Sequence, residues 1–195
     1  MLLGTGALGL GLLPSTARAQ QLTVDAVLRD PDAPVMGNPN GDVTLVEYFD
    51  YQCPFCKRMH PTLKEVVEED GNVRLIMKDW PIFGAPSVRA SQLALGAVAL
   101  GAYGEINDAL MATEAKLSDA DVERVVGAVV EVDEAMDAYR AERSKWDALL
   151  QRNDFQAASL GFRGTPAFAI EKTLYSGALD RATLEEAITN ARSAS

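Results

Sequence analysis

The segment Tyr51-Gln-Cys-Pro-Phe-Cys-Lys57 carries the strongest indication of the fold of this chain. It follows closely on Val43–Phe49, a run that is apolar and β-branched except for Thr44 and Glu47 and is therefore typical of a strand buried on both faces. It also opens a predicted helix at about residues 54–69, where a proline in the first turn needs no N–H partner. Two cysteines thus lie at the point where a buried strand gives way to a helix.

The position of this cysteine pair predicts redox chemistry. At a helix N-terminus the peptide dipoles sum to a partial positive charge and the first N–H groups lack partners, so both features stabilise a thiolate on Cys53. We expect its pKa to fall from about 8.5 into the range of roughly 3.5–7.5, which makes the corresponding disulfide a stronger oxidant. Cys56 lies on the same helical face, within reach of a disulfide. We predict Cys53 as the attacking nucleophile and Cys56 as the resolving cysteine.

Other interpretations of the pair are weaker. A purely structural disulfide across so short a loop would constrain the unfolded chain by only about 2 kcal/mol. A zinc site would need two further ligands, and His60 is the only histidine, so no metal is predicted. His60 lies about 10 Å along the helix from Cys53, too far to act as its base, and we expect a surface or packing residue. We expect Asp50, just before the pair, to be a solvated loop acid.

The rest of the chain predicts an α/β domain with helices inserted in its middle. Residues 73–80 are expected to form a second strand, and the short strand–helix–strand unit favours a parallel pair. Residues 87–160 have a helical pattern throughout. Two short strands near 167–170 and 173–175 and a final helix follow. We expect the outer pieces to share one sheet, with the helical block between them.

With these features in place, the chain resembles the DsbA-like branch of the thioredoxin superfamily over essentially all of residues 42–188. The resemblance implies an α/β, thioredoxin-like fold, in which a central mixed β-sheet is flanked by helices and carries an inserted all-helical subdomain at about residues 86–161. The domain would occupy residues 43–195 and follow a lead-in of residues 20–42, which we expect to hold a short helix and a turn-rich stretch. The resemblance also implies a redox-active disulfide between the two cysteines and no cofactor.

Client binding is implied by the same resemblance. The dipeptide Thr165-Pro166 resembles the family's cis-proline loop, so Pro166 is expected to be cis and to face the cysteines. The Thr165 backbone is then expected to pair with a bound client segment, which is a short case of strand addition. Pro54 and Phe55, between the cysteines, are expected to contact the client as well.

A proton relay is the third implication. Glu47 interrupts an otherwise apolar strand, and a buried carboxylate is costly unless it has a partner. Lys78 lies in the neighbouring predicted strand. The resemblance implies that Glu47 and Lys78 form an acidic–basic pair under the cysteines and relay the proton of the resolving thiol, Cys56.

The N-terminal segment predicts an exported protein. Met1–Leu13 is apolar, and Ala17-Arg-Ala19 is typical of a signal-peptidase site, so residues 1–19 are expected to be a signal peptide cleaved before Gln20. Thirteen apolar residues are too few to span a membrane. The net charge of −10 argues against binding to nucleic acid or anionic membranes. The resemblance implies a periplasmic location, exported client proteins and a membrane redox partner.

Several functions remain open at this point. The leading hypothesis is a monomeric oxidase that donates disulfides to clients, because residues 20–42 are too short for the dimerisation domain that isomerases of the superfamily carry. An isomerase or reductase kept reduced by an electron donor is the first alternative, since Phe55 cannot stabilise a thiolate and Thr165 also resembles those branches. A non-catalytic binding protein or chaperone is the second. A glutathione-dependent isomerase is disfavoured, because such sites typically lack the second cysteine.

Overall fold

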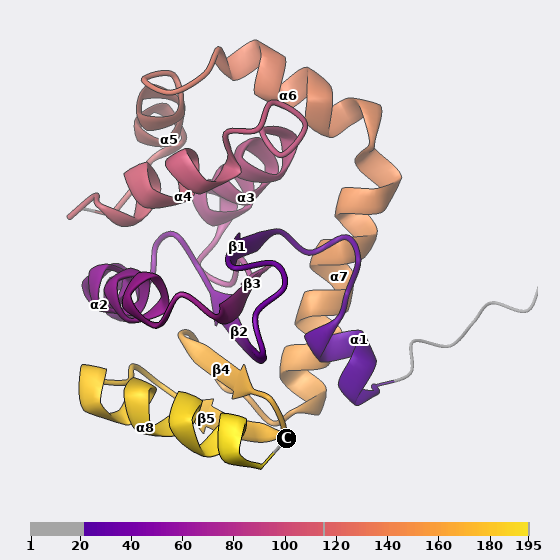
Figure 1. Cartoon of the computed structure of the whole chain (residues 1–195). Helices are drawn as coiled ribbons and strands as arrows, with labels where there is room; N and C mark the ends of the chain where they lie inside the picture. The colour runs from indigo at the N-terminus through magenta and orange to yellow at the C-terminus, as the bar shows by residue number, and fades with distance from the viewer. Residues whose placement is uncertain (1–21, 115, 195) are drawn as a thin grey trace, which may run out of the picture.

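The computed structural model describes residues 22–114 and 116–194 (Figure 1). The predicted signal peptide, residues 1–19, lies outside the described residues. The elements, in chain order, are α1 (Val24–Leu28), β1 (Val35–Gly37), β2 (Val43–Phe49), α2 (Pro54–Asp70), β3 (Val73–Asp79), α3 (Ala85–Gly96), α4 (Tyr103–Met111), α5 (Asp119–Val126), α6 (Val132–Ala141), α7 (Arg143–Ser159), β4 (Ala167–Ile170), β5 (Thr173–Ser176) and α8 (Arg181–Ser193).

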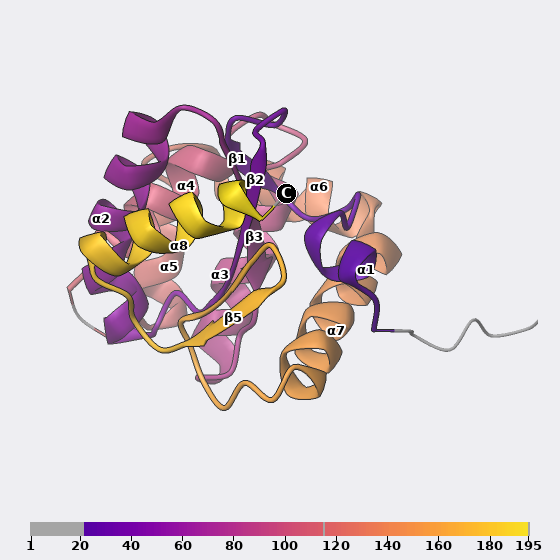
Figure 2. The same cartoon turned by 60° about the horizontal axis from the view of Figure 1, so that its bottom comes forward.

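The strands form one mixed sheet in the order β1-β3-β2-β4-β5. β2 and β3 pair in parallel, as predicted, with Val43 opposite Val73 and Phe49 opposite Asp79, while the other pairs are antiparallel. In both views α2 and α8 lie on one side of the sheet, and α1 and α7 lie on the other (Figures 1 and 2). Every residue of β2 is buried as a result. The thioredoxin-like fold predicted from the sequence is confirmed.

Local sequence determines where the helix that carries the cysteines begins and ends. Pro54 occupies the first turn of α2, and Gly71 ends the helix with a left-handed φ of 68°, a conformation in which a residue without Cβ has no steric cost. The close of α2 leads directly into β3, and this short return requires that β3 run parallel to β2. The N-terminus of α2 therefore lies at the carboxyl end of β2.

One strand was not expected. The lead-in contains β1, which pairs antiparallel with β3 at the edge of the sheet, where Val35 lies opposite Ile76. It is only three residues long and lies between two turn-rich segments, so its alternation is too short to predict a strand. The lead-in is thus part of the sheet. Among the described residues, no helix is both long and apolar enough to cross a membrane.

The helices α3 to α6 gather at one end of the sheet, and α7 returns along its face (Figure 1). The block depends on a close approach of α3 to α6: a Cβ placed on Gly96 would overlap the backbone carbonyl of Ala135. Glycine at this position lets the two helices pack with their backbones in contact.

We predict that Gly96→Ala lowers the free energy of unfolding by roughly 1–3 kcal/mol, because the added methyl group overpacks the contact between the two helices. Urea denaturation of the oxidised protein measures the change. Gly104→Ala is the matched control, because a Cβ there meets nothing within 4 Å, and it is expected to be neutral or stabilising by up to about 1 kcal/mol. Equal midpoints for the two variants would contradict the proposed packing of α3 on α6.

Candidate active site

Cys53 is the N-cap residue of α2 and is 1% exposed. Its sulfur accepts a hydrogen bond from the backbone N–H of Cys56 at 3.4 Å. Its thiol also donates to the backbone carbonyl oxygen of Thr165, at a sulfur–oxygen distance of 3.1 Å. The sulfur therefore lies between the first turn of a helix and a loop that is more than a hundred residues away in the sequence.

The two cysteines have pKa values that are shifted in opposite directions. The pKa of Cys53 is lowered to about 6, first by its hydrogen bond with the Cys56 side chain and then by the Thr165 side chain and the amides of Cys56 and Phe55, against the opposing effect of burial. The pKa of Cys56 is raised far above its ordinary value, mainly by burial and then by its hydrogen bond with Cys53. Near neutral pH the thiolate therefore resides on Cys53, and Cys56 stays protonated.

The Thr165–Pro166 peptide bond, just before β4, is cis. Phe55 is 54% exposed and lines a hollow of about 500 Å³ that Thr165 and Pro166 also line. Pro54 is also exposed. The structure thus brings together Cys53, Phe55 and the cis-proline loop, which the sequence placed in two distant segments.

Glu47 lies beneath the cysteines and is 1% exposed. One of its carboxylate oxygens, Oε2, is buried without a hydrogen-bond partner among the described residues. Burial, and then the charge on Cys53, raises the pKa of Glu47 to about 8. The same carboxylate acts electrostatically on Cys56 and helps to raise the pKa of that thiol. Glu47 is therefore a buried acid that can hold or release a proton close to physiological pH.

The expected pairing of Glu47 with Lys78 is wrong. In the parallel register Lys78 lies opposite Tyr48, whereas Glu47 lies opposite Met77. Paired residues of neighbouring strands point to the same face, and successive residues alternate, so Glu47 and Lys78 point to opposite faces of the sheet. The Lys78 Nζ binds Asp30 Oδ2 at 3.0 Å instead, with no exposed side-chain surface. Lys78 therefore joins β3 to the lead-in and lies away from the cysteines.

Asp50 also differs from expectation, because it is 1% exposed rather than solvated. Its carboxylate accepts hydrogen bonds from the backbone N–H groups of Gln52, Ile82 and Phe83 at 2.7, 2.7 and 3.0 Å. It also accepts a hydrogen bond from the Ser87 hydroxyl at 2.7 Å. Asp50 therefore fastens the loop before Cys53 to the loop between β3 and α3. The partners come from a distant segment, so the sequence alone gave no signal.

A second buried acid was missed for the same reason. Asp79 is 1% exposed, burial raises its pKa to about 7, and the Tyr103 hydroxyl donates to its Oδ2 at 3.0 Å. The neighbouring Tyr51 hydroxyl accepts a hydrogen bond from Asn107 Nδ2 at 3.2 Å. Helix α4 supplies both Tyr103 and Asn107, so this polar cluster ties the inserted helices to the segment that precedes Cys53.

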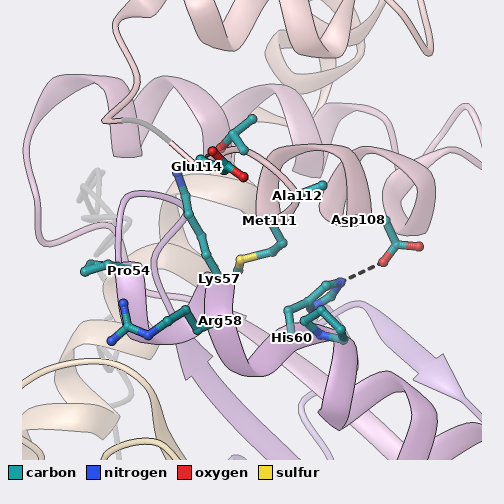
Figure 3. A pocket seen from close by; sticks show the side chains of 10 residues that line it. Pro54, Lys57, Arg58, His60, Asp108, Met111, Ala112 and Glu114 are labelled. Atoms are coloured by element: carbon teal, nitrogen blue, oxygen red, sulfur yellow. Dashed lines mark hydrogen bonds and ion pairs between the residues drawn. The ribbon is translucent and has the colours of Figure 1, made fainter.

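His60 is a buried packing residue, one of the two placements expected for it. Its Nε2 lies 2.8 Å from Asp108 Oδ1 beside a hollow of about 350 Å³ between α2 and the end of α4 (Figure 3). Burial lowers the pKa of His60, although its hydrogen bond with Asp108 opposes the shift. In the part of the chain that the structure describes, no group of three or more His, Cys, Asp or Glu side chains could hold a metal ion.

A low-pKa cysteine at a helix N-terminus, with a shielded cysteine three residues later and a cis-proline loop against its sulfur, defines a thiol–disulfide oxidoreductase on a thioredoxin-like fold. The family model described as Thioredoxin matches residues 29–190, and the chain belongs to this family. The DsbA-like resemblance of the sequence is therefore confirmed.

Solved structures with similar folds support the same class. The chain is 36% identical to a thioredoxin-like oxidoreductase from Silicibacter pomeroyi DSS-3, with a TM-score of 0.85, covering 89% of this chain and 100% of that one. It is 26% identical to the thiol-disulfide exchange protein α-DsbA2 from Wolbachia pipientis, with a TM-score of 0.79 and coverage of 85% and 90%. It is 27% identical to a periplasmic thioredoxin-like protein from Salmonella enterica serovar Typhimurium, with a TM-score of 0.72 and coverage of 89% and 99%.

Curated relatives match over part of their length. The chain is 29% identical over 167 residues to the Na(+)/H(+) antiporter NhaA 1 of Salinispora arenicola, which covers 83% of this chain and 25% of that protein. The chain thus spans about a quarter of the length of the curated relatives it matches.

We predict that the Cys53 thiol of the reduced protein titrates with a pKa of about 6, because its sulfur accepts hydrogen bonds as a thiolate. The pH dependence of the alkylation rate and of thiolate ultraviolet absorbance measures it. Cys56→Ala removes the hydrogen bond between the Cys56 side chain and the Cys53 sulfur, which is the largest cause of the lowered pKa, so the titration midpoint should rise in this variant. A wild-type midpoint near the ordinary cysteine value of about 8.5 is the result that contradicts the proposed geometry.

A separate prediction concerns Glu47, whose pKa is raised from 4.5 to about 8 on folding. A raised pKa contributes stability that is complete below about pH 4.5 and is lost as the pH rises towards 8. Glu47→Gln should therefore stabilise the oxidised protein at pH 7 by roughly 2–4 kcal/mol relative to wild type, with little difference at pH 4. Urea unfolding at both pH values measures this, and a gain that is independent of pH would refute the assignment.

Proposed function

We propose that this protein is an exported disulfide oxidase, which transfers the Cys53–Cys56 disulfide to client proteins. The observation that carries the proposal is the low pKa of Cys53, which is about 6. Stabilising the thiolate stabilises the reduced pair, and the corresponding disulfide becomes a stronger oxidant. The backbone amide of Cys56, which donates to the Cys53 sulfur in the first turn of α2, supplies a physical cause for that shift.

The proposed reaction starts from the disulfide form. A client thiolate attacks the Cys53 sulfur, forms a mixed disulfide and expels Cys56 as a thiolate. Because the pKa of Cys56 is raised far above its ordinary value, this thiolate takes up a proton. The proposed donor is Glu47, a buried acid whose charge acts on Cys56 and whose own pKa is about 8. A second client thiolate then attacks the client sulfur, which leaves an oxidised client and a stabilised Cys53 thiolate. Two electrons pass from the client to the cysteine pair, and a membrane redox partner would remove them.

Client binding would use the surface next to the sulfur. In the proposed complex an extended client segment pairs with the Thr165 backbone beside Pro166, as a short strand addition. Phe55 offers exposed apolar surface in the same hollow, and the exposed Pro54 precedes it at the start of α2. The site residues predicted from the sequence, apart from Lys78, are compatible with this arrangement.

The proposed location is the periplasm, reached through a signal peptide cleaved before Gln20. The periplasmic relative from Salmonella and the apolar first residues of the chain support it. We also propose that the protein acts as a monomer on exported clients. An isomerase or reductase is the second candidate, and the specific observation in its favour is Phe55, whose side chain has no group that could hydrogen-bond the thiolate.

The reduction potential separates these candidates. We predict a standard reduction potential of roughly −180 to −120 mV, measured by equilibration with glutathione redox buffers. This is well above the value of about −270 mV of a reductase such as thioredoxin. Cys53 is expected to be largely oxidised in cells, as measured by alkylation of trapped samples. Cys53→Ser and Cys56→Ser should each abolish the transfer of disulfides to a reduced client, because neither variant can form the Cys53–Cys56 disulfide. Only Cys56→Ser keeps the Cys53 thiolate and should still be trapped as a mixed disulfide with an oxidised client.

A potential near −270 mV together with reduced cysteines in cells would favour the reductase or isomerase instead. If Cys53→Ser kept the full activity of the wild type towards client proteins, both redox functions would be excluded and the non-catalytic binding protein or chaperone would remain.

A further inference from the structure

Two arginines flank the reactive cysteine although the chain carries a net charge of −10. Arg58 lies on α2, five residues after Cys53, and Arg163 lies in the loop that leads to Thr165. Both side chains are exposed. Arg163 lines the hollow of about 500 Å³ next to Phe55, and it is the one charged residue among the described residues that line it.

These two arginines also differ from the others in their contacts. Within residues 22–114 and 116–194, Arg58 and Arg163 are the arginines whose guanidinium groups make no hydrogen bond or ion pair with the protein. The remaining described arginines bind a carboxylate or, in one instance, a carbonyl and a hydroxyl oxygen: Arg29, Arg74, Arg89, Arg124, Arg140, Arg143, Arg152, Arg181 and Arg192. Among the described residues, the two arginines without a hydrogen-bonded or ion-pair partner thus both lie near the reacting sulfur.

The position of Arg58 is defined by an aromatic ring. Its guanidinium carbon lies 4.5 Å from the centre of the Phe55 ring, a cation–π contact that keeps the charge at the edge of the hollow. Figure 3 shows the guanidinium turned away from His60 and Asp108, towards the Pro54 end of the helix. The two guanidinium groups therefore lie close to Phe55, one stacked on its ring and the other in the wall of the same hollow.

Nearby acids do not cancel these charges. Asp108 is already bound by His60 at 2.8 Å and by Lys64 at 2.5 Å. Glu114 lines one hollow together with Arg58 and Lys57 and another with Lys57, so two cations accompany it in the first, and it does not line the hollow next to Phe55. The surface that a client segment would cross is therefore positive as well as apolar.

We propose that Arg58 and Arg163 recognise client segments that carry Asp or Glu close to the reacting cysteine. This inference rests on the proposed function and names the class of client that the same site prefers. A client carboxylate matches the fork of guanidinium donors, with which it can form two parallel hydrogen bonds, and the apolar part of the segment packs on Phe55. Long-range attraction between acidic segments and this positive surface would also raise the rate of encounter at low salt.

Thiol–disulfide exchange with two matched peptides tests the proposal. Each peptide carries one cysteine as a mixed disulfide with thionitrobenzoate, and the cysteine is flanked either by Asp and Glu or by Asn and Gln. The reduced full-length protein attacks the peptide sulfur through its Cys53 thiolate, and thionitrobenzoate leaves as a coloured anion. The readout is the ratio of the rate with the acidic peptide to the rate with the neutral peptide, because this ratio cancels any change in the reactivity of Cys53.

We expect Arg58→Gln/Arg163→Gln to lower this ratio about three- to tenfold, and the wild-type ratio to fall as NaCl is raised from about 20 mM to about 500 mM. The matched control, Arg140→Gln/Lys172→Gln, removes two charges from exposed positions elsewhere and should keep the wild-type ratio. A ratio that is equal in the double variant and the wild type would overturn the proposal. Absence of Cys53-dependent colour with both peptides would instead overturn the proposed function.

Discussion

The contact between the Cys53 sulfur, the first turn of α2 and the Thr165 carbonyl is the constraint on which the site depends. It requires that the start of α2 and the end of the loop before β4 lie side by side. The sheet order provides this, because β2 is central and pairs with β3 on one side and with β4 on the other. The carboxyl end of β2 leads to Cys53, and the antiparallel β4 begins next to it, so the loop that precedes β4 must arrive at the sulfur.

The two faces of the sheet carry different buried charged groups. Towards α2 lies Glu47, a buried acid without a charged partner, which makes ionisation of that carboxyl and of Cys56 costly and keeps protons near the cysteines. On the opposite face Lys78 and Asp30 form a fully buried ion pair that Arg152 completes from α7. Such pairs contribute little net stability, but removing one partner is strongly destabilising. Glu47 lies opposite Met77, and Lys78 is the next residue of β3. Because side chains alternate along a strand, the acid beside the cysteines and the ion-pair cluster lie on opposite faces although they are one register position apart.

The alternation also explains why some contacts could be predicted from the sequence and others could not. The buried run of β2, the cysteine pair after it and the later Thr165-Pro166 were sufficient to predict the fold and the approach of the cis-proline loop to Cys53, because each depends on local pattern or on a resemblance carried by those motifs. The partner of Lys78 depended on the register between β2 and β3, which no local pattern in the sequence determines. The burial of Asp50 depended on Ser87 and on amides after β3, and these contacts exist only once the inserted helices have packed. Short β1 carried too few residues for any periodic signal.

Helix α7, the last helix of the insertion, helps to position the cis-proline loop at the site. Helix α7 is bound to the sheet and to the lead-in at once, since Gln156 accepts a hydrogen bond from the Tyr48 hydroxyl at 3.0 Å and donates to the Ala26 carbonyl at 2.8 Å. The chain leaves α7 only a few residues before the cis-proline loop, and Phe162 packs on the Tyr48 ring with a centroid distance of 5.5 Å. The place at which α7 docks therefore determines where Thr165 meets Cys53. A shift of this helix along the sheet would move the Thr165 carbonyl away from the Cys53 thiol, and the hydrogen bond that holds the cis-proline loop against the nucleophile would be lost.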